Sequence, residues 1–295
     1  MEQSQKNYLE KNQERFLEEL MALLRIPSVS TKTEHKRDMD VCAQRIREFL
    51  LNSGCDHAQV ISTEGHPVVY GEKILSDDRA IVLVYGHYDV QPADEPEQWQ
   101  SALFSPVIRD GKIFTRGAAD DKCQFHMHLK ALEVMLQTGG LKHNVKFLIE
   151  GEEEIGSPSL RNFLKEHGDL LRADLVLISD NEMMGMETPS LEAGFRGASV
   201  LAVEVTDPVR DLHSGTYGGG VANPILILSK MLASLHDENN HVTIPGFYDR
   251  VRVFSAEERK MLANVPFNEE EFKRGLGIRE TWGEAGYTPL ERTLI

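Results

Sequence analysis

The chain has few cysteines, and this shortage excludes two kinds of protein. Its 295 residues contain three cysteines, Cys42, Cys55 and Cys123. They are too few and too scattered for a disulfide framework or a thiolate metal cage. We therefore expect a reducing, cytoplasmic location. Cys123 is either a reactive thiol or a buried structural one, and the second interpretation is favoured.

The chain is also short of positive charge and of long apolar runs. It has 32 Lys and Arg against 47 Asp and Glu, a formal net charge of −15. This balance argues against a nucleic-acid or anionic-membrane partner, because phosphate binding needs a cationic face. Residues 1–15 are polar without an apolar leader segment, and no stretch approaches the length of a membrane span. We expect neither a nucleic acid nor a membrane as partner.

Apolar runs of strand type alternate with segments of helical spacing, and this order indicates an α/β layered domain. A chain of 33.3 kDa also exceeds the usual size of one core, so two domains are expected. The pattern predicts helices over residues 16–24, 39–50 and 127–136, strands over 80–85, 145–149 and 175–178, and a hairpin over 104–114 with Asp110-Gly111 at its turn. Ser157 and Pro158 are typical of a helix start.

The character of the sequence changes beyond about residue 187, and we place a domain boundary near Pro189. The two domains are then residues 1–189 and 190–295. The second domain is expected to contain an alternating strand over residues 200–205, a glycine-rich loop over 215–220, a helix over 224–235 and a capping box at Ser255 and Glu258.

Four side chains able to bind metal follow four of the apolar runs. His87 follows residues 80–85, Asp120 follows 113–114, Glu154 follows 145–149 and Asp180 follows 175–178. Ligands collect at the carboxyl ends of strands in open α/β sheets. If these four ends meet at one edge of a sheet, the four side chains form a metal site.

Each of these segments also has a simpler interpretation. His87 with Asp89 offers a metal ligand and a carboxylate that orients it, or merely an ion pair in a loop. Asp120 and Asp121 precede a helix, so they are either acids favoured by the helix dipole or include a carboxylate that bridges two metal ions.

The run from Glu150 to Glu154 places four carboxylates within five residues. Such a run is commonly a solvated acidic loop. Alternatively, adjacent glutamates divide the work, one as a metal ligand and its neighbour as a general base. His213 stands beside the glycine-rich loop, where it is either a surface residue or an imidazole that stabilises an oxyanion.

At these residues the chain resembles the aminoacylase/carnosinase family of co-catalytic metallopeptidases, and most of all its dipeptidase and carnosinase branch. Five motifs in the same order carry the resemblance, which runs from about residue 10 to the last residue. They are Tyr85-Gly86-His87-Tyr88-Asp89-Val90-Gln91-Pro92, Arg116-Gly117-x-x-Asp120-Asp121-Lys122, Glu152-Glu153-Glu154-x-Gly156-Ser157, Ser179-Asp180-Asn181 and Leu212-His213-Ser214-Gly215-x-x-Gly218-Gly219.

The resemblance implies a fold and a set of ligands. The fold is a three-layer α/β catalytic domain with a mixed sheet, plus an α+β lid and dimerisation domain that is incomplete here. His87 binds one metal, Asp120 bridges both, Glu154 binds one and Asp180 the other. The ions are two divalent metals, zinc by resemblance and manganese as the alternative. The Asp120–Asp121 peptide is expected to be cis.

The resemblance also implies three catalytic roles. Glu153 is the general base, Asp89 supports the site from beside His87, and His213 reaches from the lid into the site of a partner subunit in a homodimer. The substrate is then a dipeptide, hydrolysed at its amide bond. An N-acyl amino acid deacylase of the acetylornithine or succinyl-diaminopimelate type is the alternative within the enzyme class.

Two features of the family have no counterpart in the sequence. The family has a final His ligand and a glycine-rich loop that binds the substrate carboxylate, and no suitable His follows His241. We therefore expect a C-terminally truncated member of the family. A further hypothesis is that the chain is an inactive fragment that dimerises at most and binds metal weakly.

Overall fold

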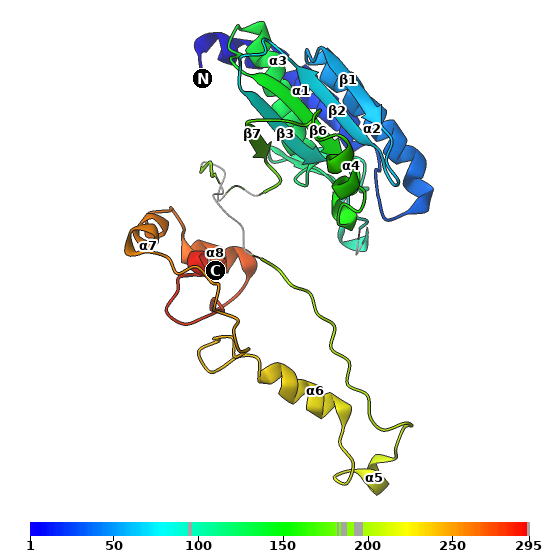
Figure 1. Cartoon of the computed structure of the whole chain (residues 1–295), viewed down its shortest axis with the longest axis vertical. Coiled ribbons are helices and arrows are strands. Elements are labelled where there is room, and N and C mark those ends of the chain that lie inside the picture. The colour runs from blue at the N-terminus through cyan, green and yellow to red at the C-terminus, as the bar shows by residue number, and fades with distance from the viewer. Residues whose placement is uncertain (94–95, 182, 184–187, 192–196, 294–295) are drawn as a thin grey trace. The chain divides into compact units, whose positions relative to one another are not determined.

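The structure of the chain, a computed structural model, describes residues 1–93, 96–181, 183, 188–191 and 197–293. The chain divides into two units, Met1–Glu182 and Met183–Ile295, and Figure 1 shows the elements of both. The division expected at residues 189 and 190 stays a prediction, because residues 184–187 and 192–196 around it lie outside the described part.

A five-stranded sheet forms the centre of unit 1. Its strands lie in the order β1 (His57–Ile61), β2 (Val68–Lys73), β6 (Asn144–Glu150), β3 (Ile81–His87) and β7 (Leu175–Ile178). The strand β3 runs parallel to both of its neighbours, β6 and β7, whereas β2 runs antiparallel to β1 and β6. The expected mixed sheet is therefore confirmed.

The three parallel strands end at the same edge of the sheet. His87, the last residue of β3, lies opposite Glu150, the last residue of β6. Tyr85 lies opposite Ile178, the last residue of β7. The segments that follow β6 and β7 therefore leave the sheet beside His87, in the position where open α/β sheets carry their ligands.

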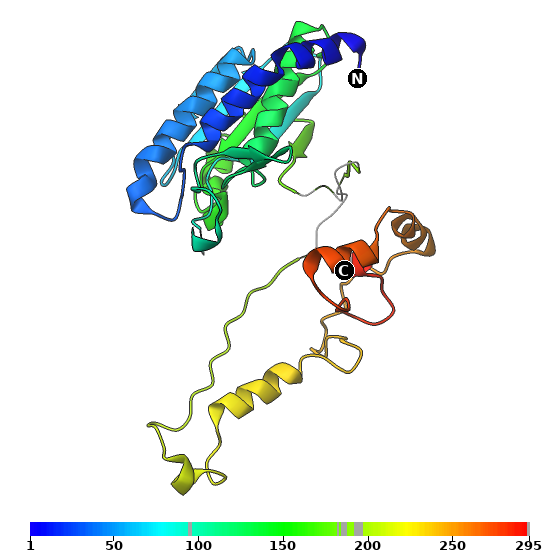
Figure 2. The ribbon, with the colours of Figure 1, turned by 180° about the vertical axis from the view of Figure 1, so that it is seen from behind.

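Three helices cover one face of the sheet. They are α1 (Gln3–Leu24), α2 (Lys36–Asn52) and α3 (Lys122–Gln137), and Figure 2 shows the two blue helices and the green one in front of the strands. Helix α1 packs against α3, whereas α2 and α3 contact the sheet directly. Leu50 of α2 and Leu129 of α3 are fully buried in this core.

Helix α4 (Leu160–Glu166) covers the other face, where Phe163 packs with Leu148 and Tyr70. Side chains of a strand alternate between the two faces, so Phe147 and Ile149 of β6 lie in the first core and Leu148 in the second. The result is the expected three-layer α/β arrangement.

Most of the predicted elements are present in unit 1. The helices α1, α2 and α3 and the strands β6 and β7 contain the predicted segments, and β3 contains its segment except for Ala80. The ends differ by a few residues or, for α1, by more than three turns. The predicted hairpin is formed by β4 (Val107–Arg109) and β5 (Lys112–Phe114). Its turn residues Asp110 and Gly111 have φ of 50° and 74°, values that an Asp-Gly hairpin turn requires.

Two sequence predictions about local structure are wrong, and two strands were missed. Helix α4 begins at Leu160 with Ser159 as its first flanking residue, whereas Ser157 has φ of 51° and lies in the preceding turn. Residues 200–205, all of which the structure describes, form no strand.

The missed strands are β1 and β2. Their short runs include Gln59, Gly71 and Glu72, so they lack a clear apolar period.

The described part of unit 2 consists of short helices and isolated bridges. The helices are α5 (Ser214–Tyr217), α6 (Pro224–Ala233), α7 (Ala256–Ala263), α8 (Glu269–Leu276) and α9 (Pro289–Arg292). The predicted helix over residues 224–235 corresponds to α6, and the predicted capping box starts α7 through Ser255 and Glu258. The α+β lid and its dimer contact stay predictions.

No helix in the described ranges is both long enough and apolar enough to cross a membrane.

Candidate metal centre

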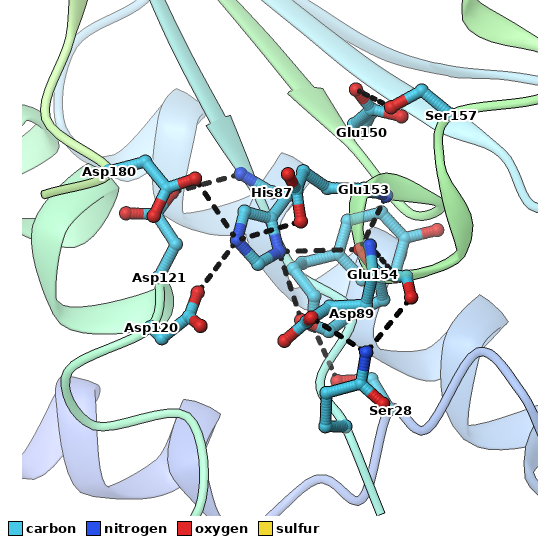
Figure 3. Close-up of polar contacts among 12 residues, drawn as sticks. Ser28, His87, Asp89, Asp120, Asp121, Glu150, Glu153, Glu154, Ser157 and Asp180 are labelled. Carbon is cyan, nitrogen blue, oxygen red and sulfur yellow. Dashed lines mark hydrogen bonds and ion pairs between the residues drawn. The ribbon is translucent and has the colours of Figure 1, made fainter. Parts of the chain in front are cut away.

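His87 is surrounded by a cluster of acidic side chains, which Figure 3 shows. Its side chain is completely buried at the end of β3. The Nδ1 atom lies 3.1 Å from the backbone oxygen of Asp89 and 3.4 Å from its Oδ1 atom. These contacts orient the ring, so that Nε2 points towards the other carboxylates.

Three carboxylates from three segments surround Nε2 of His87. Asp120 Oδ1 lies at 2.9 Å, Asp180 Oδ2 at 3.7 Å and Glu153 Oε2 at 3.9 Å. His87, Glu153 and Asp180 each offer a ligand atom within 4.8 Å of the others. The side chains of Asp120, Glu153 and Asp180 are 59%, 38% and 28% exposed, so the cluster is buried at the imidazole and accessible at the carboxylates.

The acids of the cluster raise one another's pKa values, and they raise that of His87 as well. Burial and the charges of neighbouring acids raise the pKa values of Glu153, Glu154 and Asp180. Burial opposes the protonation of His87, but hydrogen bonds to Asp120 and Asp89 outweigh it and raise the imidazole pKa to about 11. Like charges gathered in this way are costly unless a cation or a proton compensates them.

The charge of Asp120 acts on two other acids of the cluster, Glu154 and Asp180. Its charge raises the pKa of Glu154 and also that of Asp180, in both cases after the larger effect of burial. The hydrogen bond to His87 lowers the pKa of Asp120 itself. Asp120 therefore acts on both of the acids with which a bridging ligand would have to share its ions.

Asp121 fixes the strand end from the other side. The peptide bond between Asp120 and Asp121 is cis, as expected. The Asp121 carboxylate is buried and accepts a hydrogen bond of 2.9 Å from the backbone N–H of His87. Burial raises the pKa of Asp121 to about 7. Asp121 therefore contributes to the position of His87, a role that the sequence did not suggest.

The glutamates that follow β6 are held by hydrogen bonds to buried or half-buried side chains. The completely buried carboxylate of Asp89 accepts hydrogen bonds from the backbone N–H groups of Glu153, at 3.2 Å, and of Glu154, at 3.1 Å. The side-chain amide of Gln91 donates to the carboxylate of Glu154 at 2.9 Å and to its backbone oxygen at 2.9 Å. Asp89 therefore fixes His87 and the glutamate turn together.

The other two acids of the run serve the structure of this turn. Glu150 is buried and accepts hydrogen bonds from Tyr85, at 2.6 Å, and from Ser157, at 3.0 Å. Glu152 is also buried and accepts hydrogen bonds from the backbone N–H groups of His66 and Ser159. The acidic run thus divides into two buried residues that shape the loop and two that border the cluster.

The position of Asp120 corrects one sequence prediction. His87, Glu154 and Asp180 do follow adjacent strands of one sheet, but Asp120 does not, because the strand before it, β5, pairs only with β4 among the described strands. Asp120 reaches the cluster from the segment that begins α3. The convergence predicted for four strand ends is correct for three of them.

The structure brings some of the predicted site residues into contact and leaves others apart. His87, Asp120, Asp180 and Glu153 approach one another, and Glu154 lies against Gln91 beside them. His213 belongs to unit 2, where it is the exposed residue before α5. Its predicted role in an active site stays a prediction.

The donor set of the cluster fits a divalent cation. It consists of an imidazole nitrogen and carboxylate oxygens, which zinc and manganese both accept. The contact of His87 with Asp89 also fits a metal ligand. Metal-binding His side chains usually contact a carboxylate or carbonyl through their second ring nitrogen.

Comparison with known proteins gives a consistent set of similarities. The model of peptidase family M20/M25/M40 matches residues 83–276. The Beta-Ala-His dipeptidase of Rattus norvegicus is 31% identical over 285 residues, which are 90% of this chain and 57% of the relative. The chain therefore spans little more than half the length of that relative.

Two solved structures are similar to the chain over almost its whole length. The M20 family metallo-carboxypeptidase Sso-CP2 from Sulfolobus solfataricus has a TM-score of 0.74 and 33% identity, and the match covers 94% of this chain and 61% of that one. The dipeptidase Dug1p from Saccharomyces cerevisiae has a TM-score of 0.77 and 27% identity, covering 98% and 63%. Both similarities agree with the mixed α/β fold described above.

Proposed function

Because this chain belongs to peptidase family M20/M25/M40, a family of metal-dependent hydrolases in which its relatives include metallodipeptidases, we propose that it hydrolyses the amide bond of dipeptides. The observation that carries the proposal is the approach of Asp120, Glu153 and Asp180 to the Nε2 atom of His87. An imidazole and several acids around one accessible space form a site for metal-assisted hydrolysis.

We assign the ligands to two metal positions that share Asp120. When metal is bound, His87, Asp120 and Asp180 would hold the first ion and Asp120 with Glu154 would hold the second, which would have fewer donors from this chain. Zinc is proposed for both positions, with manganese as the alternative. When bound, such ions polarise the carbonyl of the substrate and make water more acidic.

Glu153 is proposed as the general base. Its carboxylate borders the cluster, is partly exposed, and has a pKa raised by burial and by its neighbours, which suits an acid that must accept and return a proton. Glu153 takes a proton from the attacking water as the oxygen–carbon bond forms. It then gives that proton to the amine nitrogen as the carbon–nitrogen bond breaks, so the amine leaves with one proton of the water and the other fragment keeps the hydroxyl group in its new carboxyl group.

Asp89 is proposed to position these groups without touching the substrate. It is completely buried, it contacts Nδ1 of His87, and it accepts hydrogen bonds from the backbone N–H groups of Glu153 and Glu154. One carboxylate therefore fixes the ligand of one metal position together with the general base. A displacement of this residue would move both.

His213 and the second unit are proposed to complete the site in a homodimer. His213 is exposed and precedes the glycine-rich segment that continues after α5, so its imidazole is accessible to a second copy of the chain. Its proposed role is to stabilise the oxyanion that develops on the substrate carbonyl. Mixing a His213→Ala chain with a Glu153→Gln chain tests this arrangement, because only a site shared between two subunits regains activity in the mixture.

Dipeptides are the first choice of substrate. The relatives with this activity in their names include the Beta-Ala-His dipeptidase and Dug1p. A carboxypeptidase is a second candidate, because Sso-CP2 is described as one and has 33% identity. A third is an N-acyl amino acid deacylase. Turnover of a panel of dipeptides, blocked longer peptides and N-acyl amino acids separates the three, and cleavage restricted to the last group would reject the dipeptidase assignment.

An inactive, weakly metal-binding fragment is the alternative from outside the enzyme class. This alternative is supported by the length of the match, which covers only 57% of the rat dipeptidase. Elemental analysis of the purified 295-residue chain decides between the two, since even one tightly held ion per chain would contradict the fragment hypothesis. A location in the cytoplasm is also proposed, and it is supported by three cysteines that all lie free in the structure.

A further inference from the structure

Gln124, in the first turn of α3, joins the two loops that carry Asp120 and Asp180. Its side-chain nitrogen Nε2 donates a hydrogen bond of 2.7 Å to the backbone oxygen of Ala119 and one of 3.0 Å to that of Asn181. Ala119 immediately precedes Asp120, and Asn181 immediately follows Asp180. One amide group therefore joins the segment just before α3 to a segment that lies 57 positions beyond Gln124 in the sequence.

A second side chain of α3 holds the same loop on its other side. His128 lies four residues after Gln124, so both project from one face of the helix. The Nε2 atom of His128 makes a hydrogen bond with the hydroxyl group of Ser179, the residue before Asp180. Both neighbours of Asp180 are thus attached to α3.

The attachment matters because Asp120 and Asp180 repel each other. Both carboxylates face Nε2 of His87, at 2.9 Å and 3.7 Å. After burial, and against the opposite effect of His87, the charge of Asp120 raises the pKa of Asp180, so the two like charges favour separation of the loops. Hydrogen bonds from a neutral amide oppose this separation without adding a charge of their own.

We propose that Gln124 is a positioning residue that fixes the spacing of Asp120 and Asp180 and thereby sets the affinity of the centre for divalent metal. The inference rests on the proposed function, because it takes these two acids as metal ligands. The residue type follows from the contacts: two carbonyl oxygens require two N–H donors, which a primary amide has. Met has similar length but no donor, so Gln124→Met removes the contacts with little change in volume.

The test compares Gln124→Met with Gln137→Met, a matched control in which the exposed last residue of the same helix is changed. Zinc and manganese are titrated against a chromophoric chelator, and the melting temperature is measured without metal. We expect Gln124→Met to bind about tenfold to a hundredfold more weakly, as residues behind metal ligands typically do when changed. The control should bind as the unchanged chain does, and both variants should melt close to it without metal.

Equal metal affinity of Gln124→Met and the unchanged chain would overturn the inference. If Gln124→Met fails to fold, Gln124→Ala removes the same two hydrogen bonds, and its unchanged affinity would have the same meaning. Absence of metal binding by the unchanged chain is a different result, because it rejects the proposed function itself. A folded Gln124→Met chain that binds metal as tightly as the control rejects only the role of Gln124.

Discussion

The Nε2 atom of His87 lies 2.9 Å from Oδ1 of Asp120, although the two residues are 33 positions apart. One ends a central strand and the other precedes a helix that covers the sheet. In the chain without metal this contact is a hydrogen bond, and it raises the pKa of the imidazole against the effect of burial. A divalent cation would compete with that proton, so metal binding should release protons and weaken at low pH.

Metal should stabilise the folded chain. A ligand that binds only the folded state contributes about 2.7 kcal/mol when its free concentration is 100 times its Kd. We therefore expect zinc to raise the melting temperature and a chelator to reverse the rise. The chain with His87→Ala should show a much smaller metal-dependent shift. An equal shift in that variant would mean that the stabilising ion binds elsewhere.

The two metal positions should differ in affinity. His87, Asp120 and Asp180 serve the first position, whereas the second has Asp120 and Glu154. With fewer donors, the second ion is expected to dissociate more readily. Isothermal titration with zinc should show one tight and one weak step for the 295-residue chain. Two steps of equal affinity would contradict our division of the ligands.

Glu153 and Glu154 should be separable by experiment, although they are adjacent. Glu153→Gln removes the proposed base and should lower turnover about 100-fold to 10,000-fold, with metal affinity nearly unchanged. Glu154→Gln removes a proposed ligand and should weaken the second metal step. Turnover at saturating metal and a zinc titration measure the two effects. Loss of metal by Glu153→Gln would show that this residue, which lies near His87 and Asp180, is itself a ligand.

Asp89→Asn should damage the centre without removing a ligand. The carboxylate of Asp89 accepts hydrogen bonds from the backbone N–H groups of Glu153 and Glu154 and contacts His87. An amide in its place offers only one acceptor oxygen. We expect metal affinity to fall about tenfold to a hundredfold. The unfolding free energy should fall by about 1–3 kcal/mol, because a buried N–H group is left without its partner. A titration and a denaturant curve on the same sample measure both.

The sequence predicted the sheet edge well because its strands are apolar runs. The segment of β6 from Val145 to Ile149 is continuous and fully buried, and β3 and β7 have similar apolar runs, so their existence and the residues after them could be identified. Conversely, β1 lies at the edge of the sheet, and only Ala58 of its residues is buried. A strand of this kind leaves little periodic signal in the sequence.

The residues that stand behind the ligands could not be predicted in the same way. Glu150 and Glu152 look like Glu153 and Glu154 in the sequence, yet the first two are buried against Tyr85, Ser157, His66 and Ser159. Their partners lie up to 86 positions away, so only the folded chain tells the four acids apart. The contacts of Gln124 depend in the same way on how α3 packs.

His126 should make the chain sensitive to acid, independently of the metal centre. It is buried in α3, where its ring packs edge-on against Phe49 at 5.9 Å. Burial lowers its pKa to about 4, and the charge of Lys130 adds to this effect, whereas Glu19 and Glu133 oppose it. The Nε2 atom has no hydrogen-bond partner within the described part of the chain, so a proton there would gain no compensating contact.

The sign of the effect follows from the lowered pKa. In the unfolded chain the imidazole binds its proton near pH 6.5, whereas in the folded chain it does so only near pH 4. The unfolded state therefore binds more protons between these values, and the unfolding free energy falls as the pH decreases, by at most about 1.4 kcal/mol per pH unit. Stability is fully present above pH 6.5 and stops falling through this residue below pH 4.

The measurement compares the unchanged chain with His126→Leu in denaturant curves at pH 7 and pH 5, both with a chelator present. The acidic cluster titrates in both chains, so only the difference between their pH dependences belongs to His126. We expect His126→Leu to lose less stability between pH 7 and pH 5 than the unchanged chain does. Equal losses would mean that His126 is protonated in the folded state without cost, and that the space around its Nε2 atom admits water.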